Sequence, residues 1–284
     1  MKKILAITAA MMMAGNAGAA LWTYDFGTGT GSYVTAAAST TFLPTPSTDG
    51  GTARVRVGTG AGGFFLENPG NASLGSGTEL RITAATATSV NKFSIYDFSD
   101  AANVFSLGFT AELLNGANGN FQFFAGDGAS FSDNSSFSGA HVFSGLEWAY
   151  GASDTLTTRY RSGANWVSLS GASFEQSKIY EIAIFGNNSA ASAGYVLNGT
   201  NYTVAVNTWD LWVNGTRVAG LAKAQLAAEG VVDSFMFIGQ SSTGNAATLR
   251  VDDIWYANAI PEPGTFGLLG GFGLLLAVRR RMRR

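Results

Sequence analysis

The sequence contains no cysteine among its 284 residues. This absence excludes disulfides, thiolate zinc sites, iron–sulfur clusters and cysteine nucleophiles. Proline occurs only 5 times and charged residues make up only 13%, whereas glycine occurs 37 times and hydrophobic residues make up 46%. The apolar fraction excludes a chain that is disordered throughout, and the lack of a Gly-X-Y period excludes collagen. Many glycines and few prolines are typical of an all-β protein whose turns need positive φ angles.

Basic charge is scarce in the middle of the chain. The formal net charge is −2, from 17 basic and 19 acidic residues. Seven basic residues stand at the two ends, so residues 20–260 hold 10 basic and 18 acidic residues, a net charge of −8. A nucleic-acid-binding surface needs basic residues to replace the counterions of the phosphates. We therefore expect no nucleic-acid partner.

The first 20 residues have the pattern of a secretory signal peptide. Lys2 and Lys3 precede an apolar run over residues 4–14, and small residues follow. The run is too short for a stable membrane span, and its flanks fit a cleaved signal helix. We expect cleavage after Ala19 or Ala20, so that the body is exported. The alternative is a buried N-terminal helix.

The C-terminal segment, residues 260–284, has three parts. Pro261, Glu262 and Pro263 come first, and the two prolines keep the glutamate extended and accessible. Residues 264–278 then carry no charge, which predicts a transmembrane helix in the inner membrane, slightly short of the usual ~20 residues. An arginine cluster closes the chain and is expected to stay in the cytoplasm. The cluster begins with Arg279, Arg280 and Arg281.

This ending resembles the PEP-CTERM sorting signal of Gram-negative bacteria. The resemblance rests on the Pro-Glu-Pro motif, the glycine-rich run at 267–271 and the arginine tail, and it covers about the last 24 residues. It implies that an exosortase, a membrane cysteine protease, recognises the tail and cuts near the motif. The body would then pass to the cell envelope or the medium after a transient stay in the inner membrane. The alternative is a permanent tail anchor.

Alternating apolar and polar residues, rich in aromatic and β-branched side chains, dominate residues 21–259. Such alternation predicts strands, and strands without intervening helices predict antiparallel sheets. Asn214 and Gly215 stand between two such segments and favour a type I′ hairpin turn. Only residues 221–229 suggest a short helix. The strands that the pattern predicts are 53–57, 105–113, 121–124, 155–160, 166–169, 180–185, 202–206, 209–213, 216–218, 235–238 and 249–256.

The sequence therefore predicts one all-β domain over 21–259, an antiparallel β-sandwich or jelly roll. Its second half resembles the laminin-G/concanavalin-A-like lectin family, over about a third of the body. The resemblance implies a lectin-like β-sandwich. A different β-sandwich and a β-helix are the alternatives. The matching features are the strand 180–185, the hairpin 210–215, the strand 234–238 and the closing strand 251–254.

Catalytic carboxylates are hard to find in this sequence. Retaining glycosidases need two carboxylates about 5–5.5 Å apart. The Glu-x-Asp-x-Glu run of the lectin-like glucanases is missing, and adjacent residues such as Asp252 and Asp253 point to opposite faces of a regular strand. His141 is the only histidine and is interpreted as a turn residue. We expect no enzymatic activity. A glycan-active enzyme stays an alternative, because carboxylates of distant strands can converge.

Calcium is the candidate ion, because it prefers several oxygen ligands from loops. Asp127 and Asp133 form one oxygen-rich group. Asp252 and Asp253 form another, at a point where the alternation breaks and a β-bulge is expected. Aspartate also favours turns without any ion. The sequence therefore predicts no cofactor other than a possible calcium ion.

Three tryptophans are candidates for stacking on sugar rings. In the segment 209–213, alternate residues face the core, so Trp212 is expected to point outward. Trp148 and Trp166 stand near predicted strand ends. The alternative is that neighbouring loops bury all three.

These patterns together predict an exported bacterial surface or extracellular-matrix protein that is processed at its C-terminal signal. The expected role is non-enzymatic and associated with exopolysaccharide. A carbohydrate-binding module and a glycan-active enzyme of the lectin-like glucanase fold are the two alternatives.

Overall fold

A computed structural model describes residues 21–260, except 48, 61, 71–73, 75–76, 87–88, 115 and 133–137. The predicted signal peptide, the predicted sorting signal and Asp133 therefore lie outside the described residues. Within the described part of the chain, no helix is long and apolar enough to cross a membrane.

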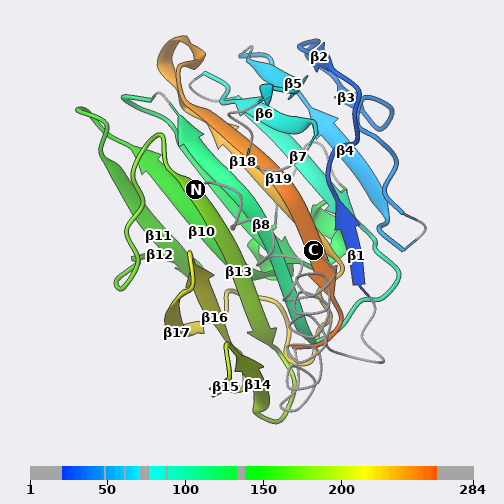
Figure 1. Cartoon of the computed structure of the whole chain (residues 1–284), viewed down its shortest axis with the longest axis vertical. Helices are drawn as coiled ribbons and strands as arrows, with labels where there is room; N and C mark the ends of the chain where they lie inside the picture. Colours follow the sequence, from blue (N-terminus) through cyan, green and yellow to red (C-terminus); the bar gives the residue numbers. More distant parts are fainter. Residues whose placement is uncertain are drawn as a thin grey trace, which may run out of the picture.

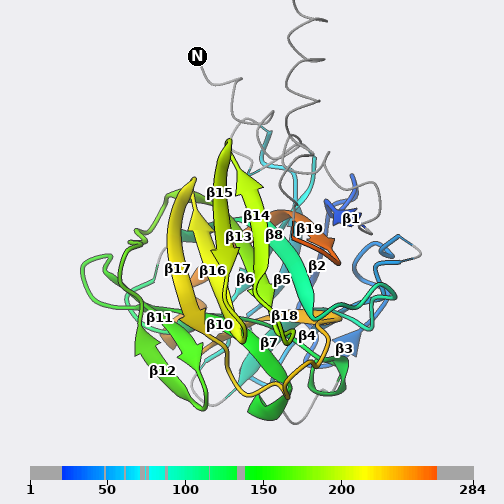
Figure 2. The same ribbon diagram turned by 90° about the horizontal axis from the view of Figure 1, so that it is seen from below.

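Two antiparallel sheets face each other across a common core, and a separate hairpin lies on the outer side of one sheet (Figures 1 and 2). The described strands of the nine-stranded sheet follow the order β17 (Thr216–Ala222), β16 (Thr208–Val213), β13 (Ile179–Asn187), β8 (Val104–Leu114), β19 (Thr248–Ala257), β6 (Glu79–Thr83), β5 (Gly63–Glu67) and β2 (Gly31–Tyr33), while β1 (Leu21–Tyr24) also pairs with β19.

The second sheet is eight-stranded among the described residues. Its order is β12 (Asn165–Ser168), β11 (Leu156–Ser162), β10 (Val142–Tyr150), β9 (Asn120–Gly126), β18 (Ser234–Gln240), β7 (Val90–Tyr96), β4 (Thr52–Arg56) and β3 (Ala38–Ser39). The separate hairpin consists of β14 (Ala193–Leu197) and β15 (Thr200–Val204). Short 3-10 turns lie at η2 (Gly128–Ser130), η3 (Gly139–His141) and η4 (Thr243–Asn245).

Period-2 alternation builds the core between the sheets. On β8, Phe105, Leu107 and Phe109 point inward and are buried, while the residues between them face outward. Phenylalanines of β9, β7 and β18 meet them from the opposite sheet, with Phe109 and Phe123 only 4.9 Å apart between ring centroids. The predicted all-β antiparallel sandwich is confirmed, and every predicted strand overlaps an observed one.

The predicted turn at Asn214–Gly215 is confirmed as the link between β16 and β17. Both residues have positive φ angles, 48° and 77°, as a type I′ turn requires. The Asn214 side chain also accepts a hydrogen bond from the backbone N–H of Glu181, 2.8 Å away, which ties this turn to β13.

The helix expected over residues 221–229 is wrong. Strand β17 continues to Ala222, and the following residues run beside β10 without helical hydrogen bonds. The N–H groups of Ala224 and Gln225 donate to the carbonyls of Phe143 and Val142 instead. Tertiary backbone pairing overrides the weak helical propensity of a segment that was too short to nucleate a helix on its own.

Strand β19 contains the expected β-bulge. Its pairing with β8 shifts register between Asp252 and Trp255, and Asp253 has a φ of 50°. The extra residue resets the alternation, so Ile254 and Tyr256 face the core whereas Trp255 faces outward. The outer face of the nine-stranded sheet therefore receives a tryptophan immediately after two aspartates.

Candidate functional site

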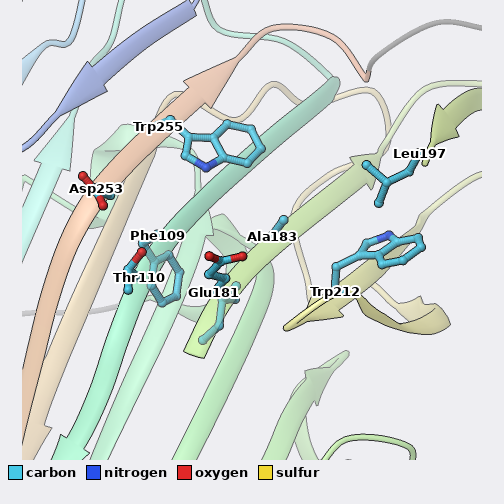
Figure 3. A pocket seen from close by; sticks show the side chains of 10 residues that line it. Phe109, Thr110, Glu181, Ala183, Leu197, Trp212, Asp253 and Trp255 are labelled. Atoms are coloured by element: carbon cyan, nitrogen blue, oxygen red, sulfur yellow. The ribbon is translucent and has the colours of Figure 1, made fainter. Parts of the chain in front are cut away.

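A groove lies on the outer face of the nine-stranded sheet, beside the β14–β15 hairpin (Figure 3). Strands β8, β13, β16 and β19 form its floor and one side, and Leu197 of the hairpin forms part of the other. The groove is therefore built by chain segments that are far apart in sequence.

Trp255 supplies the aromatic surface of the groove. Its indole lies against Gly108 of β8, because a Cβ at residue 108 would stand 2.5 Å from the indole atoms Cε2 and Cζ2. Glycine at this position thus lets the ring lie close to the sheet. Trp255 is partly buried, because it also packs against the cluster that contains Trp212 and Leu197, and the rest of its side chain lines the groove.

The opposite wall is apolar and well packed. Trp212, Leu197 and Ala183 belong to one cluster of buried side chains that joins the hairpin to the sheet. Trp212 is only 4% exposed, and Tyr202 packs edge-on against it at 5.1 Å between ring centroids. This wall is therefore tightly packed, and Ala183, Leu197 and Trp212 line the groove from it.

Two carboxylates, Glu181 and Asp253, add polar groups to this apolar groove. Figure 3 shows Glu181 between Asp253 and Trp212, with Thr110 nearby. Burial raises the pKa of Glu181, and the charge of Asp253 raises it further. Burial also raises the pKa of Asp253, with a smaller contribution from Asp25. The groove therefore combines hydrogen-bond acceptors with a half-exposed indole, which are the two components of many sugar sites.

The strand registers explain why the aspartates of the β19 bulge lie close to Glu181. Asp252 pairs with Thr110 across β19 and β8, and Thr110 pairs with Glu181 across β8 and β13. The three residues therefore form one row on the outer face, with about 10 Å between the outer two Cα atoms at the usual strand spacing. Glu79, next to Leu80 on β6, extends this row on the other side of β19.

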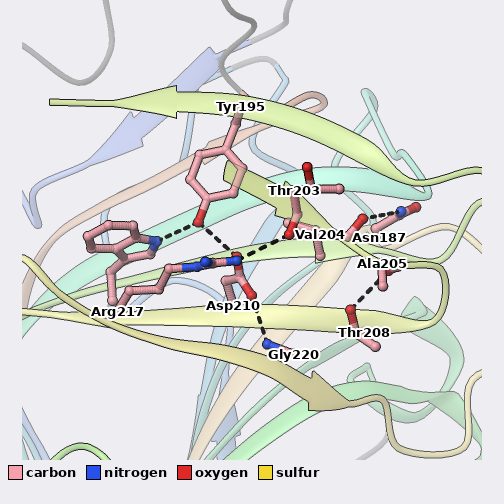
Figure 4. A network of polar contacts seen from close by, with 10 residues as sticks. Asn187, Tyr195, Thr203, Val204, Ala205, Thr208, Asp210, Arg217 and Gly220 are labelled. Carbon is pink, nitrogen blue, oxygen red and sulfur yellow. Dashed lines mark hydrogen bonds and ion pairs between the residues drawn. The ribbon is translucent and has the colours of Figure 1, made fainter. Parts of the chain in front are cut away.

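A second buried carboxylate on this face, Asp210, is fully engaged (Figure 4). Its Oδ2 accepts hydrogen bonds from the Tyr195 hydroxyl at 2.8 Å and from Nε and Nη2 of Arg217 at 2.8 and 2.6 Å. Its Oδ1 accepts one from the backbone N–H of Gly220. The Trp212 indole N–H completes this network by donating to the Tyr195 hydroxyl. Asp210 thus fastens the hairpin to the sheet.

The structure corrects the expected exposure of two tryptophans. Trp212 does lie on the face opposite Trp209, as the alternation predicted, but the hairpin covers it. Trp148 is 0% exposed and points into the core, where it packs against Phe174 at 5.7 Å. Neither presents an open ring face for stacking. Trp166 is half-buried on the other sheet.

Trp166 lies far from the groove. It packs against Phe124, and the guanidinium of Arg161 stands 5.4 Å from its ring centroid. Strand β12, which carries Trp166, is the edge of the eight-stranded sheet. The three predicted stacking residues are therefore not brought together, and only Trp212 borders the groove.

The described candidate calcium ligands lie at two separate places in the structure. Asp127 lies at the end of β9, where its Oδ2 is 3.3 Å from Nδ1 of His141. Asp252 and Asp253 lie in the bulge of β19. Among the described residues, no three Asp, Glu or His side chains converge closely enough to hold an ion by themselves.

Sequence reasoning missed Trp255, Glu181 and Gly108 as parts of the groove. The available signal was the pair of adjacent aspartates, since a bulge after Val251 turns Trp255 outward. The meeting of Glu181 with Asp253 depends on the strand order β13–β8–β19, which joins distant parts of the chain.

Comparisons with known proteins give no family for this chain. No family model matches, and no curated protein matches. Among solved structures, similar chains include a sialidase, with 13% identity, a TM-score of 0.45 and coverage of 71% of this chain and 16% of that one. Another is the carbohydrate recognition domain of Emp47p, with 11% identity, a TM-score of 0.41 and coverage of 76% and 91%.

A third similar structure is the binding domain of Botulinum neurotoxin DC in complex with rat synaptotagmin II. It shows 12% identity and a TM-score of 0.42, with coverage of 84% of this chain and 51% of that one. The chain thus spans about a sixth of the sialidase chain and half of the neurotoxin chain. These TM-scores are too low to assign the chain to the fold family of any of the three.

Proposed function

We propose that this protein is an exported surface or extracellular-matrix component whose β-sandwich binds a polysaccharide in the groove beside Trp255. The observation that carries this proposal is the partly exposed indole of Trp255, which lies against Gly108 in the same groove as the carboxylates of Glu181 and Asp253. An indole face packs on the apolar face of a sugar ring, while carboxylates accept hydrogen bonds from its hydroxyls.

The same proposal includes a concanavalin-A/laminin-G-like fold and a sorted C-terminus. Support for the fold is the pair of large antiparallel sheets with Greek-key-like crossovers, such as β8 lying between β13 and β19. Support for export and for processing by an exosortase-type protease in the inner membrane is the pattern of the two chain ends. The body would then reside in the cell envelope or outside the cell, in contact with exopolysaccharide.

Glycan binding is tested on an array of bacterial exopolysaccharides and oligosaccharides. We expect the wild-type protein to bind at least one glycan and Trp255→Ala to lose at least tenfold in affinity, because the stacking of a sugar ring on an aromatic side chain depends on the ring face. Trp166→Ala is the matched control, since this tryptophan is also half-exposed but lies on the other sheet. Equal loss in both variants, or no binding by the wild type, would contradict the proposal.

A glycan-cleaving enzyme is the second candidate, favoured by one observation. Glu181 and Asp253 face the same groove, and the pKa of each is raised by burial. A general acid needs a raised pKa, and a second carboxylate serves as base or nucleophile. Release of new reducing ends from a bound glycan, lost in Glu181→Gln, would favour this enzyme over a binding protein.

Sorting is tested separately in the native host. Mass spectrometry of the mature protein should find a chain that begins near residue 20 or 21 and ends near Pro261. A mature protein that retains residues 264–284 would contradict processing and leave the permanent anchor.

A further inference from the structure

The groove beside Trp255 carries charge of one sign only (Figure 3). Glu181 and Asp253 are the ionisable residues among its described lining, which includes no lysine, arginine or histidine. The rest of the lining is apolar except for the hydroxyl of Thr110. A ligand that enters the groove therefore meets negative charge beside an aromatic and aliphatic wall.

Four other carboxylates on the same outer face of the sheet are neutralised by arginines. These ion pairs join Glu67 to Arg81, Asp210 to Arg217, and both Glu79 and Glu112 to Arg250. Within the part of the chain that the structure describes, no ion pair includes Glu181 or Asp253. The carboxylates that lack a cationic partner are thus the two that line the groove.

A ligand that covers the groove removes water from both of these carboxylates. Taking a charge out of water is costly unless a group of opposite charge replaces the water. The hydroxyls of a neutral sugar donate hydrogen bonds but leave both charges in place, and a uronic acid adds a further negative charge. An ammonium group donates hydrogen bonds and also compensates the charge, which makes those bonds stronger.

We propose that the groove selects a polysaccharide whose sugars carry free amino groups, such as a deacetylated glucosamine polymer, over neutral and acidic polysaccharides. This inference rests on the proposed function of the groove as a polysaccharide site. The ammonium group lies against Glu181 and Asp253, and the sugar ring packs against the part of Trp255 that lines the groove. The hydroxyl of Thr110 is available to a hydroxyl of the same sugar.

The charge of the whole body favours the same ligand. Residues 20–260 carry a net charge of −8. Such a body attracts a polycation and repels a polyanion before contact, over a distance of about 10 Å at moderate salt. A cationic polysaccharide is therefore both drawn to the surface and neutralised in the groove.

The probes are chitosan oligosaccharides, the same oligosaccharides after complete N-acetylation, and oligogalacturonates of matching length. Calorimetry measures their affinity for the purified full chain at a pH just below neutral, where the amino sugar is protonated. We expect chitosan oligosaccharides to bind roughly tenfold more tightly than their N-acetylated form, because hydrogen bonds between charged groups are the stronger ones. Oligogalacturonates should not bind.

These outcomes separate the inference from the proposed function. Equal or tighter binding of the N-acetylated form or of oligogalacturonates would overturn the selection of amino sugars but leave a polysaccharide site. Binding of other glycans on the array without binding of chitosan oligosaccharides would have the same meaning. Binding of no glycan at all would overturn both.

Variants locate the selection in the groove. Asp253→Asn and Glu181→Gln each remove one charge with little change in shape, and each should weaken chitosan binding roughly tenfold while reducing its advantage over the N-acetylated form. Asp154→Asn is the matched control. Asp154 is exposed between β10 and β11 of the other sheet, and its φ of 60° resembles the 50° of Asp253, a region that asparagine adopts readily.

The control should bind chitosan as the wild type does. An equal loss in Asp154→Asn would mean that the overall charge selects amino sugars, and the assignment to the groove would be wrong. The comparison of the three probes on the wild-type protein does not depend on how any variant folds.

Discussion

Asp210 and Asp252 are two aspartates with the same burial and opposite surroundings. Each is 1% exposed on the outer face of the nine-stranded sheet. Asp210 receives donors on both oxygens, from Tyr195, Arg217 and Gly220. Asp252 has an oxygen with no donor and carboxylates as neighbours.

The difference follows from what covers each residue. The β14–β15 hairpin supplies Tyr195 above Asp210, and β17 supplies Arg217 (Figure 4). Asp252 instead lies at a gap between two strands that meet end to end along β19. Burial alone therefore does not show whether a buried carboxylate is satisfied, whereas the number of hydrogen-bond donors around it does.

The largest expected effect concerns the pH dependence of the free energy of unfolding. Burial, with Asp253, Glu79 and Asp25 nearby, raises the pKa of Asp252 from 3.8 to about 8. The folded state then holds a proton that the unfolded state has lost. This stability is complete below pH 4 and is lost as the pH rises to 8, on the order of 5 kcal/mol at about 1.4 kcal/mol per pKa unit.

Urea unfolding at several pH values in EDTA measures this decline. Asp252→Asn should flatten it, because the amide cannot titrate. The same decline in Asp252→Asn and in the wild type would show that Asp252 is not its source.

Removing the side chain of Asp210 should have the second largest effect on the free energy of unfolding. Asp210→Ala leaves Arg217 and the Tyr195 hydroxyl without their acceptor. We expect a loss of about 3 kcal/mol in the free energy of unfolding, at the low end for a broken buried pair because the Arg217 side chain is 24% exposed. A loss below 1 kcal/mol, measured by urea unfolding, would mean that the network does not fasten the hairpin.

A smaller effect is expected from Tyr195→Phe. The variant removes one hydroxyl that donates to Asp210 and accepts from the Trp212 indole. Arg217 and Gly220 still satisfy the carboxylate, so we expect a loss of about 1.5 kcal/mol, typical of a hydrogen bond to a charged group. A double-mutant cycle with Asp210→Ala should show coupling between the two residues.

The smallest stability effect, about 1 kcal/mol, is expected at the groove. Gly108→Ala places a methyl group where the Trp255 indole lies, so the ring must move away from the sheet. We expect a roughly tenfold weaker affinity for a bound glycan. Gly29→Ala is the control, because nothing lies within 4 Å of its Cβ position. Unchanged glycan affinity in Gly108→Ala would place the ligand elsewhere.

Much of the architecture could be predicted from the sequence. Alternation on β8 and the Asn214–Gly215 turn depend on local chemistry, and both are confirmed. The bulge of β19 could also be predicted, because two adjacent aspartates break the alternation. Strands such as β10 and β7 gave weaker signals, since both of their faces are largely buried and their apolar and polar residues do not alternate strictly.

The candidate site was less predictable for a physical reason. Trp212 points away from the core as expected, but its exposure depends on a hairpin that lies over the sheet. Trp148 is indistinguishable by local pattern from an exposed strand tryptophan. Trp255 becomes part of the groove only because β8 offers it a glycine. Each of these outcomes requires a contact between segments that are distant in the chain.

The pairing of β1 with β19 sets the geometry of any attachment to a surface. Leu21 is the partner of Ala257, so the polypeptide enters and leaves the sandwich at one corner. A body tethered through either end would therefore be held at the same corner of the sandwich.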